Sequence, residues 1–195
     1  MTRSYFNSKA DVWDRKIAER DPEKLENMAK NLDIQSGSKV LDVGTGTGVF
    51  IPFLLKKMGK NGKLVCLDFA EKMLEKAREK NFGDNIDYVC SDITSTKFED
   101  EVFDVVVCYS SFPHFHDKPK VLTEIRRLLK EGGKLYICHT SSRATINEIH
   151  QRVPELSTDL IPDRGELRRL FSLAGFVHIV VCDTKSSYLV KAEKL

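Results

Sequence analysis

Hydrophobic residues in the middle of the chain come in short runs that are separated by amphipathic patterns. Five apolar runs have the composition of buried strands, at residues 39–43, 63–67, 86–90, 103–109 and 134–139. Apolar residues at helical spacing predict helices between them, at residues 47–58, 70–81 and 117–130. This alternation is typical of a parallel sheet covered by helices on both faces.

The pattern changes after residue 140. Residues 143–152 and 163–174 predict two further helices, with an irregular stretch containing Pro154 and Pro162 between them. Two final strand-like runs at 176–183 and 186–191 are joined by so short a link that they must pair as an antiparallel hairpin. Few large apolar residues occur at 140–150, so we expect the insertion at 140–162 to form a wall of the acceptor pocket.

The first 35 residues predict two helices before the sheet begins. Residues 8–20 and 22–32 each carry an apolar stripe, with Ser8 and Asp21 as expected N-caps and Pro22 at a first helical position. Phe6 and Trp13 either pack onto the domain or allow residues 1–35 to close over a ligand as a lid. No repeat, low-complexity tract or linker interrupts the chain, so residues 1–195 are expected to form a single domain.

Composition narrows the class of partner. Lysine and arginine (31) are interleaved with aspartate and glutamate (29), and the net charge is +2, which gives no indication of a nucleic-acid partner. No apolar run approaches the roughly 18–20 residues that span a bilayer. The first residues lack an apolar signal region, so we expect a cytoplasmic protein with no membrane partner. No feature indicates an oligomeric state.

The cysteines favour a structural interpretation. There are five, none is in a CxxC pair, and each lies in or at the end of a predicted strand. We therefore expect them to pack in the core. They are Cys66, Cys90, Cys108, Cys138 and Cys182.

A glycine-rich turn follows the first strand. Gly44, Gly46 and Gly48 alternate with threonines, and glycine allows a ligand to approach the main chain closely. The spacing G-x-G-x-G departs from the dinucleotide pattern G-x-G-x-x-G, which would need glycine at Val49, and no P-loop is present. Asp68 at the end of the second strand could accept hydrogen bonds from both hydroxyls of a ribose.

At this point the chain resembles the class I S-adenosylmethionine-dependent methyltransferases. The resemblance rests on residues 40–48, Asp68, Ser91-Asp92-Ile93, residues 103–108, residues 121–133 (with Glu131 where proline is usual) and residues 170–176. It implies an α/β, Rossmann-like three-layer sandwich, whose seven-stranded, mostly parallel sheet has its last strand antiparallel.

The resemblance also implies S-adenosyl-L-methionine as the cofactor. The cofactor-binding residues would be Asp42, Gly44, Thr45, Gly46, Gly48, Asp68, Phe69, Met73, Asp92, Ile93 and Tyr109. Asp68 and Asp92 have an alternative structural interpretation, because each precedes a helical pattern and could be its N-cap.

Four histidines are expected on the acceptor side of the pocket, and they leave three interpretations open. The predicted catalytic residues are His114, His116 and His139, one of which would act as a general base. His114, His139 and His150 could instead hold a divalent metal with a carboxylate such as Asp117, Glu148 or Asp159. The third interpretation is that they are hydrogen-bonded loop residues.

Arg143 and His150 are candidate substrate contacts. Arg143 could bind an anionic group or form a surface salt bridge. His178 lies in the sixth strand and is expected to be structural.

The acceptor is expected to be a small molecule. The stretch after the fourth strand lacks the Asn/Asp-Pro-Pro-Tyr/Phe pattern with which related methyltransferases act on nucleic acids and protein amides. The sequence is more similar to the small-molecule branch, which includes quinone methyltransferases, so phenolic, quinone-like, thiol or metalloid acceptors are candidates. The alternatives are a catalytically silent S-adenosylmethionine-binding sensor or partner subunit, and a metal-assisted methyltransferase that uses the histidine cluster.

Overall fold

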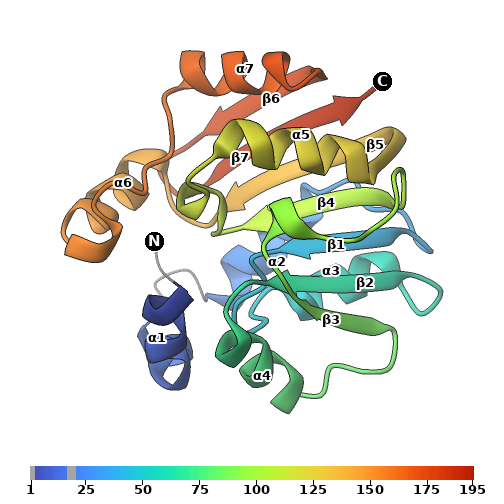
Figure 1. Cartoon of the computed structure of the whole chain (residues 1–195), viewed down its shortest axis with the longest axis horizontal. Helices are drawn as coiled ribbons and strands as arrows, with labels where there is room; N and C mark the ends of the chain where they lie inside the picture. Colours follow the sequence, from blue (N-terminus) through green and yellow to red (C-terminus); the bar gives the residue numbers. More distant parts are fainter. Residues whose placement is uncertain (1–2, 17–20) are drawn as a thin grey trace.

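A computed structural model describes residues 3–16 and 21–195, and its centre is one seven-stranded sheet (Figure 1). The strand order is β3-β2-β1-β4-β5-β7-β6. The first five strands run parallel, and β7 is antiparallel to both β5 and β6. The strands are β1 (Lys39–Val43), β2 (Lys63–Asp68), β3 (Ile86–Cys90), β4 (Phe103–Tyr109), β5 (Leu129–His139), β6 (Phe176–Asp183) and β7 (Tyr188–Lys194). The predicted fold class and terminal hairpin are confirmed.

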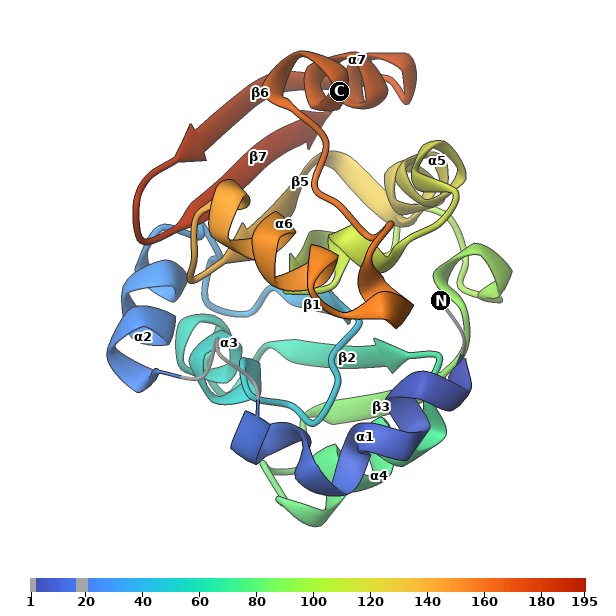
Figure 2. The ribbon, with the colours of Figure 1, turned by 90° about the vertical axis from the view of Figure 1, so that its left-hand side faces the viewer.

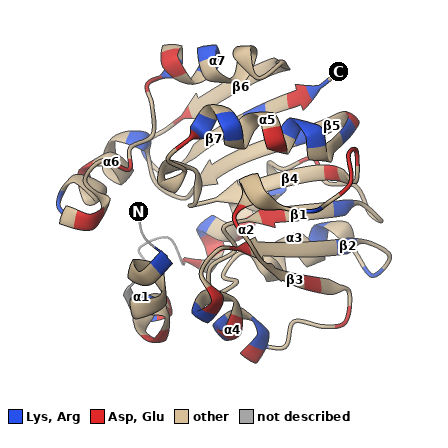
Figure 3. Ribbon diagram, in the orientation of Figure 1, with Lys and Arg blue, Asp and Glu red and all other residues tan. Residues whose placement is uncertain are grey.

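Helices cover both faces of the sheet and enclose two hydrophobic cores. On one face lie α2 (Pro22–Lys30), α3 (Ile51–Met58) and α4 (Glu71–Glu79), and on the other lie α5 (Lys118–Leu128) and α7 (Arg164–Leu173). Both signs of charge occur along α4, α5 and α7 (Figure 3). Among the described residues no helix is both long enough and apolar enough to cross a membrane.

Several predicted boundaries shift for local reasons. The helix expected from residue 47 begins at Ile51, because Gly44, Gly46 and Gly48 all have positive φ and extend the turn. The fifth strand begins at Leu129, which pairs with Phe103; the register then shifts, so that the next pair is Val105 with Lys134.

The first helix lies earlier than its sequence pattern indicated. It is α1 (Arg3–Lys16), and residues 17–20 of the predicted helix lie outside the described residues. The prediction of Ser8 as an N-cap is wrong, because Ser8 lies within α1 and its hydroxyl donates to the carbonyl of Tyr5 (2.7 Å). Asp21 does cap α2, and Pro22 occupies the first turn.

Two segments distant in sequence lie at the edge of the sheet where the parallel strands end. One is α1, which packs against α4, and the other contains α6 (Arg143–Gln151) and the short helix η3 (Pro154–Leu156) (Figure 2). Together they flank the edge at which the glycine turn lies.

The cysteine prediction is correct for three residues and wrong for two. Cys66, Cys108 and Cys138 are buried in the central strands β2, β4 and β5. Cys90 and Cys182 are exposed, because β3 and β6 are the outer strands of the sheet and are less covered.

Candidate functional site

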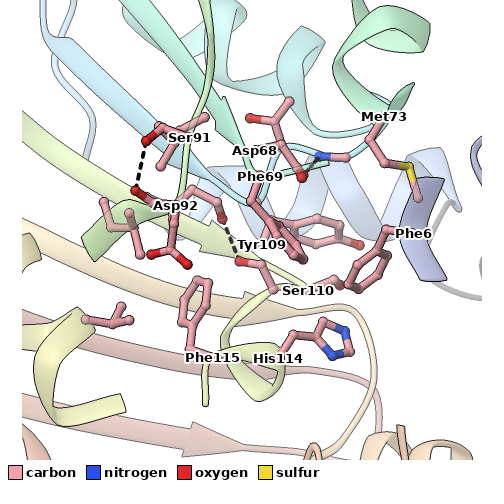
Figure 4. A pocket seen from close by; sticks show the side chains of 18 of the residues that line it. Phe6, Asp68, Phe69, Met73, Ser91, Asp92, Tyr109, Ser110, His114 and Phe115 are labelled. Carbon is pink, nitrogen blue, oxygen red and sulfur yellow. Dashed lines mark hydrogen bonds between the residues drawn. The ribbon is translucent and has the colours of Figure 1, made fainter. Parts of the chain in front are cut away.

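A cavity opens at the carboxyl ends of β1, β2 and β4, where the strand order reverses. The chain passes from β1 to β2 on one side, whereas β4 pairs with β1 on the other side, so the loops diverge and leave space between them. The cavity is lined by the turn after β1, the end of β2, the short helix η1 (Ile93–Ser95), the segment after β4, and α1. Figure 4 shows these side chains pointing toward a common space.

The three glycines of the turn have different structural surroundings. Gly44 (φ +76°) lies so close to Ser111 that a Cβ would stand 2.4 Å from the Cβ of Ser111. Gly46 (φ +58°) has open space where its Cβ would be, and it lines the cavity. Gly48 does not line the cavity. It is needed instead for packing, since a Cβ at this position would stand 2.8 Å from Cδ1 of Ile51. Only the first two glycines therefore border the space available to a ligand.

Asp68 faces the cavity from the end of β2. One carboxylate oxygen accepts from the backbone N–H of Gly46 (2.8 Å) and the other accepts from that of Ala70 (2.9 Å). Burial raises the pKa of Asp68 to about 6. The N-cap of α4 is Ala70, so the helix-cap alternative does not describe Asp68. Its two N–H partners fix the carboxylate and leave lone pairs for hydroxyl donors.

The far end of the cavity is mostly apolar. Phe69, Met73 and Ile93 line it, and Met73 and Ile93 are buried. Asp92 also lines it while capping η1, because one of its oxygens accepts from both the N–H and the hydroxyl of Thr94 (2.7 Å each). The cap interpretation of Asp92 is therefore correct, and the side chain still borders the cavity.

Asp42 lies beneath the turn and does not line the cavity. It is 2% exposed; one of its oxygens accepts from the hydroxyl of Thr45 (2.9 Å), and the other, Oδ1, has no hydrogen-bond partner among the described residues. Burial, with a smaller effect from Asp68, raises the pKa of Asp42 to about 7. Thr45 itself lines the cavity, as does Tyr109, whose ring stacks on Phe50 (4.5 Å between centroids).

Helix α1 covers one side of the cavity. Phe6 makes edge contacts with Phe69 (5.7 Å) and with His114 (5.4 Å), and Trp13 also lines the space. At the rim, Lys80 forms an ion pair with Asp14 (2.6 Å), and the hydroxyl of Thr47 donates to Asp14. These contacts join the first helix to the glycine turn at Thr47 and to the C-terminal end of α4 at Lys80.

The histidines separate into two groups. His114 and His116 line the cavity, whereas His139 is buried behind it against Tyr188, with 6.3 Å between ring centroids. His150 does not line the cavity but stacks on the ring of His114 (4.9 Å). Only His114 and His116 are thus placed to touch a molecule in the cavity.

His114 has a carboxylate partner. Its Nδ1 lies 3.0 Å from Oδ2 of Asp159, and both side chains are largely buried. Burial lowers the pKa of His114, and the hydrogen bond to Asp159 opposes that effect. Within residues 3–16 and 21–195 no group of three or more His, Cys, Asp and Glu side chains is arranged to hold a metal ion. The metal interpretation has no support in this geometry.

Arg143 does not line the cavity either. Its guanidinium Nη1 donates to the carbonyl of Ile161 (3.2 Å), which fastens α6 to the loop after η3. Among the described residues that line the cavity there is no lysine and no arginine. The described part of the lining therefore offers no lysine or arginine side chain to an anionic ligand.

Several residues of the site were not predicted, and four of them make contacts that shape it. Thr47 and Asp14 join the turn to α1, Ser111 donates to the carbonyl of Val43 (2.6 Å), and Ser110 lines the cavity with φ +51°. The serine pair directly after a buried strand was a usable signal. The contact between Asp14 and Thr47 spans 33 residues of sequence, and no local sequence pattern predicts it.

Comparisons with known proteins agree with this geometry. Residues 41–137 match the family described as a methyltransferase domain. The demethylmenaquinone methyltransferase of Staphylococcus carnosus is 32% identical over 177 residues, covering 78% of this chain and 73% of that protein.

Two solved structures share the fold. A SAM-dependent methyltransferase from Aquifex aeolicus has a TM-score of 0.77 and 25% identity, and the match covers 97% of this chain and 98% of that one. The methyltransferase bound to the Trm112 activator of Haloferax volcanii has a TM-score of 0.80 and 21% identity, with 96% of each chain covered.

Proposed function

The chain belongs to the class I S-adenosylmethionine-dependent methyltransferases, and on this basis we propose that it methylates a small, uncharged acceptor with an aromatic ring and an ionisable hydroxyl group. The observation that carries the proposal is the composition of the cavity. A glycine turn and a buried carboxylate lie on one side, and on the other lies a wall that carries His114 and whose described residues include no lysine or arginine.

The residues present fit the cofactor. Gly46 leaves open space where any other residue would place a Cβ, and the fixed carboxylate of Asp68 has lone pairs to spare for ribose hydroxyls. Phe69, Met73 and Ile93 would enclose the adenine ring, and Asp92 would accept from its amino group. When bound, S-adenosylmethionine supplies an activated methyl group on a sulfonium.

The lining supports an uncharged aromatic acceptor. Phe6, Trp13 and Phe115 border the cavity, and aromatic side chains pack well against a flat ring. Among the described lining residues, a carboxylate or phosphate on the acceptor would meet no lysine or arginine to offset its desolvation. The relative from Staphylococcus carnosus acts, by its name, on demethylmenaquinone, so a naphthoquinol is our first candidate.

His114 would take the proton of the acceptor. With Nδ1 bonded to Asp159, the other ring nitrogen, Nε2, is left for a hydroxyl in the cavity. Its lowered pKa favours the neutral imidazole near pH 7, which is the form that can accept a proton. Phe6 and Trp13 would exclude water above the reacting groups, so we interpret α1 as a lid.

An acceptor panel that follows release of S-adenosylhomocysteine tests the proposal. We expect turnover with a short-tailed 1,4-naphthoquinol, and little or none with its dimethyl ether or with a carboxylated naphthoquinol of the same size. The ether lacks the ionisable proton, and the carboxylate adds a negative charge for which the described lining residues offer no lysine or arginine. Equal turnover of all three would refute the proposal. Binding of the cofactor with no turnover of any small acceptor would favour the sensor alternative.

A further inference from the structure

The imidazole of His114 is held from three directions by segments distant in sequence. Phe6 of α1 meets its ring edge to face (5.4 Å), and His150 of α6 stacks on it (4.9 Å, 29° between the planes). Asp159, in the loop between η3 and α7, bonds its Nδ1 (3.0 Å). Figure 4 shows the ring of His114 beside Phe6 at the edge of the cavity. Such packing leaves the ring little rotational freedom.

Asp159 contacts both imidazoles. Its carboxylate bonds Nδ1 of His114, and its backbone carbonyl accepts from Nδ1 of His150. The residue is 3% exposed, so its carboxylate is shielded from water. The loop that carries it is fixed by Asn147, whose side chain bonds both the N–H (2.9 Å) and the carbonyl (3.0 Å) of Ile161. Asp159 is therefore a buried residue on a braced loop.

The chemistry of the carboxylate then sets the position of the proton on His114. An ionised carboxylate can only accept hydrogen bonds, so Nδ1 must carry the hydrogen when the ring is neutral. The lone pair is then on Nε2, the nitrogen left for a molecule in the cavity. A neutral histidine with the opposite tautomer would present an N–H and could not accept a proton there.

We propose that Asp159 is a positioning residue that fixes His114 in the tautomer with the proton on Nδ1, so that Nε2 accepts the proton of the methyl acceptor. The inference rests on the proposed methyl transfer. The acceptor O–H bond would break and its proton would form a bond to Nε2. The deprotonated acceptor would then form a bond to the methyl carbon while the bond from that carbon to the sulfonium sulfur breaks, and S-adenosylhomocysteine would leave with the electron pair on sulfur. Asp159 would also stabilise the imidazolium that results, because the charge of its carboxylate favours the protonated ring.

Other charged groups surround the pair. His150 and His139 disfavour a positive charge on His114, as does burial, which is the largest effect on its pKa. The negative charges of Asp159 and Glu166 favour the protonated amine of Lys118, which donates to the carbonyls of Pro113 and Phe115. Removing the charge of Asp159 alone should therefore lower the basicity of His114 further.

Nitrogen NMR of the histidine side chains tests the tautomer directly and needs no acceptor. In the full chain, with His114 assigned by comparison with His114→Gln, we expect Nδ1–H and a bare Nε2 at about pH 8, where the ring is neutral. A wild-type spectrum with the proton on Nε2 would overturn the inference, whatever any variant does.

Asp159→Asn, compared with Asp163→Asn, separates positioning from general stability. Asp163 caps α7 four residues away, and asparagine caps a helix equally well, so this control makes the same chemical change without touching His114. In Asp159→Asn we expect a lower pKa of His114 by NMR. We also expect a kcat reduced at least about tenfold, with the acidic limb of the pH profile moved to lower pH.

Asp159→Glu keeps the charge and should restore part of kcat. An unchanged pKa and an unchanged pH profile in Asp159→Asn would overturn the inference. The proposed function fails by a different measurement. A wild-type chain that binds no S-adenosylmethionine would refute methyl transfer, while the tautomer of His114 would still be read from the same spectrum.

Discussion

The close approach of Gly44 to Ser111 gives a quantitative prediction about the glycine turn. In Gly44→Ala the new Cβ would stand 2.4 Å from the Cβ of Ser111, on a backbone with φ +76°. We expect about 1–2 kcal/mol from the backbone conformation, since a side chain is disfavoured at positive φ. Overpacking against Ser111 adds about 1–3 kcal/mol. The variant should therefore lose about 2–5 kcal/mol of unfolding free energy.

Two substitutions of Ser111 separate these contributions. Ser111→Gly removes the Cβ and relieves the clash, whereas Ser111→Ala removes only the hydroxyl that donates to Val43 (2.6 Å). In the double-mutant cycle, Gly44→Ala with Ser111→Gly should recover about 1–3 kcal/mol, the clash alone. The cycle with Ser111→Ala should show a coupling below about 0.5 kcal/mol.

Urea unfolding, followed by circular dichroism and by tryptophan fluorescence, measures each corner of the cycle. The comparison is valid where the two signals coincide and the slope m is unchanged. Equal coupling with Ser111→Gly and Ser111→Ala would refute the steric argument, as would a Gly44→Ala variant that loses less than about 1 kcal/mol.

Three further predictions concern the lining and the base of the cavity. The pKa of Asp42 is raised to about 7 in the folded chain. Between about pH 4 and 7 the folded chain therefore holds a proton that the unfolded chain releases. The unfolding free energy of the wild-type chain should fall as the pH rises through that window. Asp42→Asn should flatten this dependence by a few kcal/mol in urea titrations at pH 5 and pH 8, and parallel curves would contradict it. Asp68→Asn should weaken S-adenosylmethionine binding by about 10–100-fold in calorimetry, because one of its two N–H partners would face an amide N–H; unchanged affinity would remove Asp68 from the site. Phe6→Ala should reduce the stability of the α1 contact by about 3 kcal/mol and speed hydrogen exchange in α1 but not in β4, with Phe6→Leu as the control that keeps burial.

The parts of the fold that local patterns determine were predictable from the sequence. The central strands are continuous apolar runs because the sheet is buried on both faces, and the glycines after β1 mark the point at which the strand ends and the turn begins. The start of α1 was not predictable from capping residues. Phe6 belongs in the helix because it packs against Phe69 and His114, which follow much later in the chain.

On the acceptor side too, the positions of residues in strands were predictable, but their contacts with distant segments were not. His139 ends β5 as predicted, but it shares the face of Leu135 and Ile137 in the core between the sheet and α5, and it is buried without lining the cavity. His150 and Asp159 meet His114 only because α6 and its following loop fold back over the sheet edge. The spacing of these residues in the sequence does not predict that they meet.

Isothermal titration calorimetry of the full chain with S-adenosylmethionine tests the central claim most directly, namely that the cavity at the strand switch point holds this cofactor. We expect one site per chain with a dissociation constant on the order of 10 µM, or about −7 kcal/mol. The absence of saturable binding up to about 1 mM, which is weaker than about −4 kcal/mol, would contradict the claim.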